Sequence, residues 1–297
     1  MPADITSLRS ALADELLRAF GLPKNARLQR IFGRLFHGLI EQFACGGQTF
    51  DQVVADEGLQ PAADGLLDRF CTSYSADGLE TIPLQGPLLV VSNHPGTIDV
   101  LLILASLRRP DVKLLSNDIP FLQRLPATST HLIYGARTKD IHKRMLSVLA
   151  GLSHLKKGGT LVLMGTGLID PDPEVYPDAP ASLECWSPSI ELFLKQVPET
   201  QVLVTIASGV LSPVWAHHPI TWLRKEPRRK RLLAEIGQVA QQALFPRLRN
   251  LSPHISFAPP VRLPELQLES RSDQALPAII IRAKTLLAQH MERIRNT

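Results

Sequence analysis

His94 and Asp99, five positions apart, are the two residues whose types and spacing best suit acid–base chemistry. A carboxylate that binds one imidazole nitrogen fixes the tautomer and stabilises the imidazolium, so the other nitrogen can act as a general base. Such a base can take the proton of an alcohol or amine that attacks an acyl carbonyl, and the acceptor itself is then the nucleophile. The alternative is a histidine in a turn that binds the aspartate for local structure alone.

The residues around this pair predict a strand, a turn and a helix, in that order. Leu88–Val91 is a short apolar run typical of a buried strand, and Asn93–Gly96 contains residues that favour turns. From Thr97 onward the apolar residues recur at helical spacing. Side chains lean toward the N-terminus of their helix, so Asp99 can lean back toward His94. The first N–H groups of this helix are expected to stabilise a developing negative charge beside the base.

The segment around His94 resembles the first motif of the glycerolipid acyltransferase family, which includes the lysophosphatidate acyltransferases. That motif is His-x4-Asp, here preceded by Val91-Ser92-Asn93, and the upstream segment Gly78–Pro83 is similar to the family's approach to it. The resemblance covers about residues 75–297. It implies roles for four residues: His94 as the base, Asp99 as its orienting partner, and Asn93 and Gly96 as substrate-binding residues.

A second motif of the family has a partial match at Leu132–Arg137. Family members carry an arginine at the end of this motif, so the resemblance implies that Arg137 binds an anionic group of the substrate. A guanidinium suits that role because it can bind a phosphate through two parallel hydrogen bonds. The alternative is a surface arginine at the start of the helix that follows.

The third motif departs from the family's pattern, which is Phe-Pro-Glu-Gly-Thr-Arg. Gly165 and Thr166 match and are predicted to bind substrate, whereas Met164 replaces the glutamate and Gly167 replaces the arginine. Backbone N–H groups at 165–167 can still cradle an anion. The two missing charges indicate either an acceptor less anionic than glycerol 3-phosphate or an activity that is low or lost.

The composition indicates a folded protein with a sizeable core. The chain has 297 residues, 44% of them hydrophobic and 20% charged, and a net charge of +4 that is compatible with an anionic membrane or a phosphate-bearing substrate. No apolar run approaches the ~20 residues needed to span a bilayer, and the first residues lack the basic-then-apolar pattern of a secretion signal. We therefore expect a cytoplasmic protein, peripheral at the inner face of a membrane.

The three cysteines are scattered and odd in number, which fits neither a disulfide framework nor a metal site and indicates a reducing compartment. No metal ion and no cofactor are expected. Acyl-coenzyme A or acyl carrier protein enters only as the donor substrate.

Apolar runs alternate with helical stretches from about residue 79, which predicts an α/β fold. We expect a mixed central sheet flanked by helices over 75–297, with a helical N-terminal extension over 1–74. The predicted strands are Leu88–Ser92, Val112–Leu115, Thr130–Tyr134, Thr160–Met164, Val202–Ala207 and Ile255–Ala258, and the predicted helices are Ile98–Leu107, Lys139–Lys156, Ser187–Gln196, Arg229–Leu244 and Ala275–Arg295. The acidic, proline-rich segment Asp170–Pro180 is expected to be an exposed loop.

Three helices are predicted in the N-terminal extension, and the second is the most informative. They are Ile5–Phe20, Ala26–Phe43 ended by Gly46-Gly47, and Thr49–Ser73 broken at Pro61. The second helix combines a wide apolar stripe with arginines on another face: Arg27, Arg30 and Arg34. It is expected either to lie in a membrane interface, with Phe32 and Phe36 inserting, or to pack against the next domain.

The densest run of basic residues is Trp222–Arg231. Its charges suit anionic headgroups, the phosphates of coenzyme A or an acidic carrier protein. Nucleic acid is not favoured, because no stacking platform or groove-reading helix accompanies the run. The alternative is a solvated loop.

Together these patterns predict an acyltransferase. It would move a fatty acyl group from an acyl thioester to a hydroxyl or amine of a glycerolipid or related acceptor, with His94 as the base. The alternative function is a catalytically weak, membrane-associated protein that binds lipid with the same fold.

Overall fold

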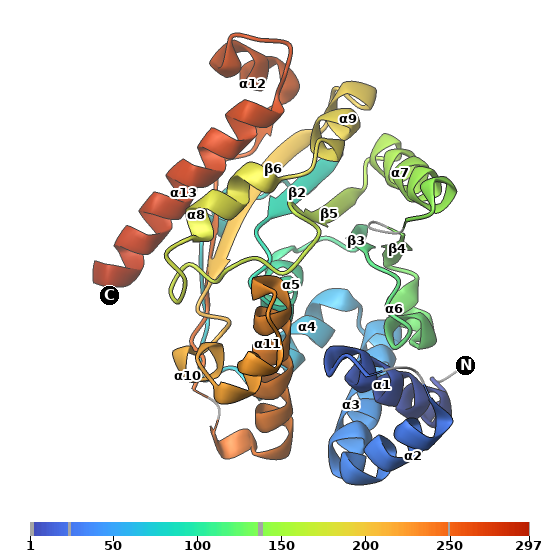
Figure 1. The fold of residues 1–297 in the computed structure, drawn as a ribbon. Helices are drawn as coiled ribbons and strands as arrows, with labels where there is room; N and C mark the ends of the chain where they lie inside the picture. The colour runs from blue at the N-terminus through green and yellow to red at the C-terminus, as the bar shows by residue number, and fades with distance from the viewer. Residues whose placement is uncertain (1–2, 23–24, 136–138, 249, 297) are drawn as a thin grey trace.

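Within the residues that the computed structural model describes, which are 3–22, 25–135, 139–248 and 250–296, an eight-stranded mixed sheet lies at the centre (Figure 1). The order across it is β1-β7-β6-β2-β5-β3-β4, with β8 also paired to β6. The pairs of β6 with β7 and β8 are antiparallel and the others are parallel. The strands are β1 (Ser75–Asp77), β2 (Leu88–Ser92), β3 (Val112–Ser116), β4 (Leu132–Tyr134), β5 (Thr160–Met164), β6 (Gln201–Ser208), β7 (His254–Phe257) and β8 (Val261–Arg262).

Helices cover both faces of this sheet, which confirms the predicted fold class. Their bounds are α1 (Ile5–Ala19), α2 (Ala26–Leu35), α3 (His37–Asp56), α4 (Leu59–Phe70), α5 (Thr97–Ser106), α6 (Pro126–Ser129), α7 (Ile141–Lys156), α8 (Ala179–Ser182), α9 (Ser189–Gln196), α10 (Pro213–Ala216), α11 (Pro227–Leu244), α12 (Leu263–Ser270) and α13 (Leu276–Asn296). The bounds of β2 agree with the prediction, and so do those of β5.

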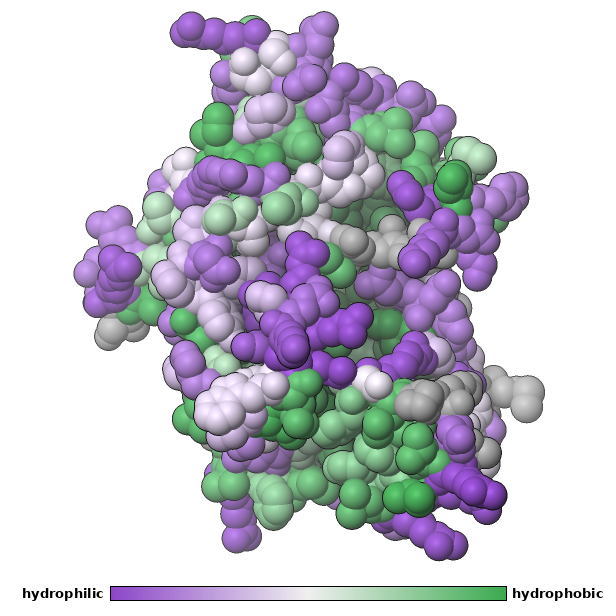
Figure 2. Space-filling model, in the orientation of Figure 1, coloured by the Kyte–Doolittle hydropathy of each residue, from purple (hydrophilic) through white to green (hydrophobic). Residues whose placement is uncertain are grey.

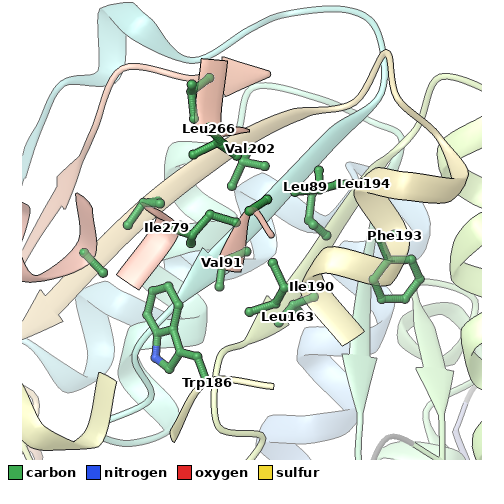
Figure 3. Close-up of a cluster of buried hydrophobic side chains, with 14 of the residues drawn as sticks. Leu89, Val91, Leu163, Trp186, Ile190, Phe193, Leu194, Val202, Leu266 and Ile279 are labelled. Atoms are coloured by element: carbon green, nitrogen blue, oxygen red, sulfur yellow. The ribbon is translucent and has the colours of Figure 1, made fainter. Parts of the chain in front are cut away.

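The central strands are buried on both faces, and their alternate residues belong to two apolar clusters. Leu89 and Val91 of β2 point into a cluster with α9 and α13, which Figure 3 shows. Leu88 and Val90 point the other way, into a cluster with α4 and α5. The sheet thus holds α5 firmly against one of its faces, directly after β2.

The N-terminal helices lie together at one end of the sheet (Figure 1), and their predicted divisions are wrong. The stretch predicted as one helix over Ala26–Phe43 breaks at Phe36, and the start predicted at Thr49 lies inside α3. Gly46 and Gly47 do not end a helix but lie inside α3, where a Cβ at Gly47 would overlap the ring of Phe121. The other break falls at Gly58 rather than at Pro61, because proline in the first turn of a helix interrupts no intrahelical hydrogen bond.

The rings of Phe20, Phe32 and Phe36 pack against one another, with centroids 5.3–6.0 Å apart, and all three residues are half-buried. They stabilise the corner where α2 ends and α3 begins, and the insertion of Phe32 and Phe36 into a membrane stays a prediction. The helix α4 shares an apolar cluster with α5. The division into domains at 74 and 75 stays a prediction.

Two residues of the basic run Trp222–Arg231 stabilise the fold, while Lys225, Arg228 and Arg229 are exposed. Arg224 donates to the carbonyl oxygens of Arg18 and Ala19 at the end of α1, and Arg231 is buried with its guanidinium 5.8 Å from the Tyr176 ring centroid. These two cations hold the fold together and do not face solvent as a patch.

None of the helices in the described ranges is long and apolar enough to cross a membrane.

Candidate functional site

The predicted pair of His94 and Asp99 forms as expected. His94 follows β2, and its Nδ1 lies 3.0 Å from Oδ2 and 3.2 Å from Oδ1 of Asp99, which stands in the first turn of α5. The Asp99 side chain has no exposed surface, whereas 23% of the His94 side chain is exposed. In the part of the chain that the structure describes, His94 Nε2 has no hydrogen-bond partner. A buried carboxylate therefore orients the ring, and the far nitrogen is left accessible for proton transfer.

Two further carboxylates surround this pair, and sequence reasoning missed both. Asp170 accepts a hydrogen bond from the His94 N–H at 3.0 Å and another from Thr166 Oγ1 at 2.8 Å, and its own N–H donates to the His94 carbonyl oxygen at 2.7 Å. Glu235 of α11 accepts from both the N–H and the Oγ1 of Thr97, the first residue of α5. Asp170 thus fixes the backbone at His94, and Glu235 fixes the start of the helix that carries Asp99.

These carboxylates control the pKa of His94. Burial alone would lower it, but Asp99, and at longer range Glu235 and Asp170, outweigh burial and raise the pKa from 6.5 to about 9. Burial also raises the pKa of Glu235, and it raises that of Asp170 to about 6. The free imidazole is therefore protonated at neutral pH, and the fraction that can act as a base increases toward pH 9.

A glutamine at position 235 should show this control in a pH profile. Glu235→Gln keeps an acceptor for Thr97 but removes a negative charge that raises the pKa of His94, so that pKa falls. The rising limb of kcat/KM against pH should move to lower pH. Glu199→Gln, an exposed carboxylate on the loop after α9, is the control and should leave the limb in place. A limb unmoved by Glu235→Gln would contradict the assignment.

Asn93 does not face substrate, contrary to the prediction. Its Nδ2 donates to the carbonyl oxygen of Ala207 and its Oδ1 accepts from the Ala207 N–H, each at 2.8 Å. The side chain therefore continues the pairing of β2 with β6 beyond the end of the strand. Gly96 is buried against Glu235, where a Cβ would lie 3.3 Å from Oε1, so its small size serves packing.

Five N–H groups in the two segments predicted to stabilise an anion are already occupied. At the start of α5, Gly96 and Val100 donate to Asp99 and Thr97 donates to Glu235. After β5, the Gly165 N–H donates to Ser92 and the Gly167 N–H to Met164. These five N–H groups therefore do not form the anion cradle that the sequence suggested.

The other residues predicted in the third motif have different surroundings. Gly165 makes room for the indole of Trp186, which a Cβ would overlap. Thr166 and Gly167 line the cavity described below, as does Met164, which makes that wall apolar. Arg137 lies outside the described residues.

A cavity of about 1040 Å³ opens beside the exposed edge of His94. Its walls are mainly apolar and come from α3, α4, α5, β3, β5 and α11, including Phe43, Phe50, Leu66, Ile98, Leu101, Leu104, Leu114, Met164 and Val239. Among the described residues, three exposed cations also line it: Arg69, Lys139 and Arg144. Figure 2 shows a hollow near the middle of the molecule with green surface inside and purple residues around it. The site thus combines a general base, an apolar space and cationic groups.

The loop Asp170–Pro180 is not the exposed segment that was predicted, because Asp170 and Asp172 are 3% and 0% exposed. The Asp172 carboxylate accepts four backbone hydrogen bonds, from the N–H groups of Glu174, Gly209, Val210 and Leu211, at 2.9–3.1 Å. It joins this loop to the segment that follows β6, while Asp170 joins the loop to His94.

A second histidine lies in an arrangement similar to a catalytic triad, away from the cavity. His290 Nε2 is 2.8 Å from Ser208 Oγ, which donates to Glu174 at 2.6 Å. Burial lowers the pKa of His290 to about 4, and both Ser208 and His290 are almost fully buried. A substrate has no access to this serine, so the group stabilises the contact of α13 with the sheet.

The chain matches no protein-family model, and no curated protein matches it in sequence. Among solved structures, it is similar to that of the 1-acyl-sn-glycerophosphate (LPA) acyltransferase PlsC from Thermotoga maritima, with 13% sequence identity, 96% of each chain covered and a TM-score of 0.45. A likeness at this level does not assign a function, so a function has to be argued from the geometry of the site.

Proposed function

We propose that this protein transfers a fatty acyl group from an acyl thioester to a hydroxyl or amine of a glycerolipid or related lipid. The observation that carries the proposal is the position of His94: its ring is oriented by a buried carboxylate and its free edge lines a large apolar cavity. Pockets that bury drug-sized ligands are commonly about 300–1,000 Å³, so this cavity has room for an acyl chain together with part of an acceptor.

The reaction follows from the groups at the site. Neutral His94 takes the proton of the acceptor hydroxyl as its oxygen attacks the thioester carbonyl. The tetrahedral intermediate collapses, the carbon–sulfur bond breaks, and the imidazolium returns the proton to the leaving thiolate. Asp99 stabilises the imidazolium between these two steps. The products are an ester and a free thiol.

The cations at the cavity support an anionic group on one of the two substrates. Arg69, Lys139 and Arg144 are exposed and line the opening. A phosphate of coenzyme A, the acidic surface of an acyl carrier protein, or the headgroup of an anionic lipid can each be held there. Arg137, by the family resemblance, would add to this set.

The alternative function, lipid binding with weak catalysis, is favoured by one observation. The N–H groups of Gly96, Thr97, Val100, Gly165 and Gly167 all have partners within the protein. None of these five can stabilise an oxyanion without first giving up its present hydrogen bond. A site in which these five N–H groups stay paired would still bind an acyl lipid.

An acceptor panel tests the proposal. Free thiol released from acyl-coenzyme A is measured with glycerol 3-phosphate, lysophosphatidate and zwitterionic or uncharged lysolipids. Because Met164 and Gly167 supply no charge, glycerol 3-phosphate should be about ten- to a hundredfold slower than the best lysolipid, the loss expected for one charged hydrogen bond. Lipid binding without acceptor-dependent thiol release would favour the alternative function. A preference for glycerol 3-phosphate would overturn the acceptor prediction alone.

A further inference from the structure

The helix α7 presents an unusual apolar face to solvent. Ile141, Met145, Leu146 and Leu149 are 75%, 54%, 54% and 54% exposed. Because positions spaced three, four and eight apart on a helix share one face, these four side chains form one apolar surface. The C-terminal half of α7 packs normally, since Leu152 and Leu155 belong to the apolar cluster on that face of the sheet. The exposed apolar face therefore belongs to the N-terminal half of α7.

Basic residues surround this face. Between positions 139 and 157 the chain has five lysines or arginines and a single acid, Asp140. That carboxylate is already used, because its Oδ1 accepts hydrogen bonds from the N–H groups of His142 and Lys143 and caps the helix. The combination of an apolar face and flanking bases is the pattern of a helix that lies in a membrane interface.

The position of α7 connects this surface to the site. Lys139, just before the helix, and Arg144, in its second turn, both line the cavity that reaches His94. In Figure 1, α7 stands apart from the N-terminal helices and from α11, which supply other walls of that cavity. A flat surface that contacts the exposed face of α7 would lie next to the cavity opening.

We propose that α7 docks the protein on an anionic lipid surface, with Ile141, Met145, Leu146 and Leu149 in the acyl boundary and the neighbouring bases on the headgroups. The occupant is lipid and not an acidic protein, because four contiguous large apolar side chains match an acyl layer, while the bases match only its charged border. The reason for docking rests on the proposed function, since a lipid acceptor then enters the cavity directly. The docking itself requires no catalysis.

Vesicle flotation tests the proposal with the full chain. The protein is mixed with vesicles of phosphatidylcholine and phosphatidylglycerol in equal parts, or of phosphatidylcholine alone. We expect binding to the anionic vesicles that weakens as salt screens the bases. The double variant Met145→Asp/Leu149→Asp should bind at least about tenfold more weakly, because two apolar side chains no longer leave water.

Two controls make the result specific. Leu268→Asp/Ile281→Asp introduces the same charges at residues that are 79% and 62% exposed on α12 and α13, and should bind as the wild type does. His94→Ala should also bind fully, so a failure of docking and a failure of catalysis can be told apart. Circular dichroism checks that each variant is folded.

Three outcomes would overturn the proposal. The first is equal binding of the wild type and the α7 variant. The second is loss of binding only when Ile31 and Leu35 of α2, which are 58% and 73% exposed, are changed to aspartate. The third is a wild-type dimer in gel filtration that the α7 variant converts to a monomer, because a second copy would then cover this face.

Discussion

Replacing His94 by alanine should reduce acyl transfer by about 10²–10⁴-fold, the usual contribution of a general base. The ring is attached at a loop after β2, and among the described residues it forms hydrogen bonds only to Asp99, so the backbone contacts of His94 with Asp170 remain in the variant. The loss should therefore appear in turnover and not in folding. Thiol release from acyl-coenzyme A with the best lysolipid acceptor measures it.

The matched control is His217→Ala, because His217 is exposed and its ring contacts the Pro213 carbonyl oxygen. It should keep wild-type turnover. Asp99→Asn should lose most of the activity too, since an amide cannot stabilise the imidazolium. Wild-type turnover in a folded His94→Ala protein would show that the chemistry occurs elsewhere.

Replacing Asp172 by alanine should lower the free energy of unfolding by about 4 kcal/mol, a large fraction of the stability of a typical domain. In the wild type the Asp172 carboxylate accepts hydrogen bonds from four N–H groups, and in the variant these four donors lose their acceptor. Three of them belong to consecutive residues, Gly209–Leu211. Each buried donor without a partner costs about 1–3 kcal/mol, and partial relaxation of the loop reduces the sum. Urea unfolding followed by circular dichroism measures the change.

Asp178→Ala is the control for this prediction, because Asp178 belongs to the same loop but is exposed. It should change the free energy of unfolding by less than about 0.5 kcal/mol. Asp172→Asn should lie between the two, since an amide keeps one acceptor oxygen and loses the other. If Asp172→Ala were as stable as Asp178→Ala, water or a shifted loop would have to satisfy those four donors.

The sequence predicted the parts of the site that depend on local pattern. The strand β2 is buried on both faces and therefore appears as an unbroken apolar run, and the turn and helix that follow bring His94 and Asp99 together within six residues. No longer-range contact is needed for this pair. The same reasoning gave correct bounds for β5.

Asp170 and Glu235 could not be found in this way, because each reaches the site from 76 or more positions further along the chain. The sequence pattern of α11 also predicts the wrong environment for its polar residues. Its polar side chains Arg231, Glu235, Gln238 and Gln242 recur every three or four residues, which is typical of a solvated face, yet all four are buried. Glu235, Gln238 and Gln242 form hydrogen bonds to polar atoms of other segments, and Arg231 lies against the Tyr176 ring. A sequence pattern does not contain such distant partners.

The contact of Glu235 with Thr97 has a consequence for the order in which the site is assembled. During synthesis His94 and Asp99 leave the ribosome together, while α11 follows more than a hundred residues later. A nascent chain can therefore pair the two residues early, yet it completes their surroundings only when a distant helix docks. Since contacts of high sequence separation form slowly, the return of enzymatic rate after dilution from denaturant should lag behind the return of helical signal. The rate of acyl transfer during refolding would then report the docking of α11 onto the start of α5.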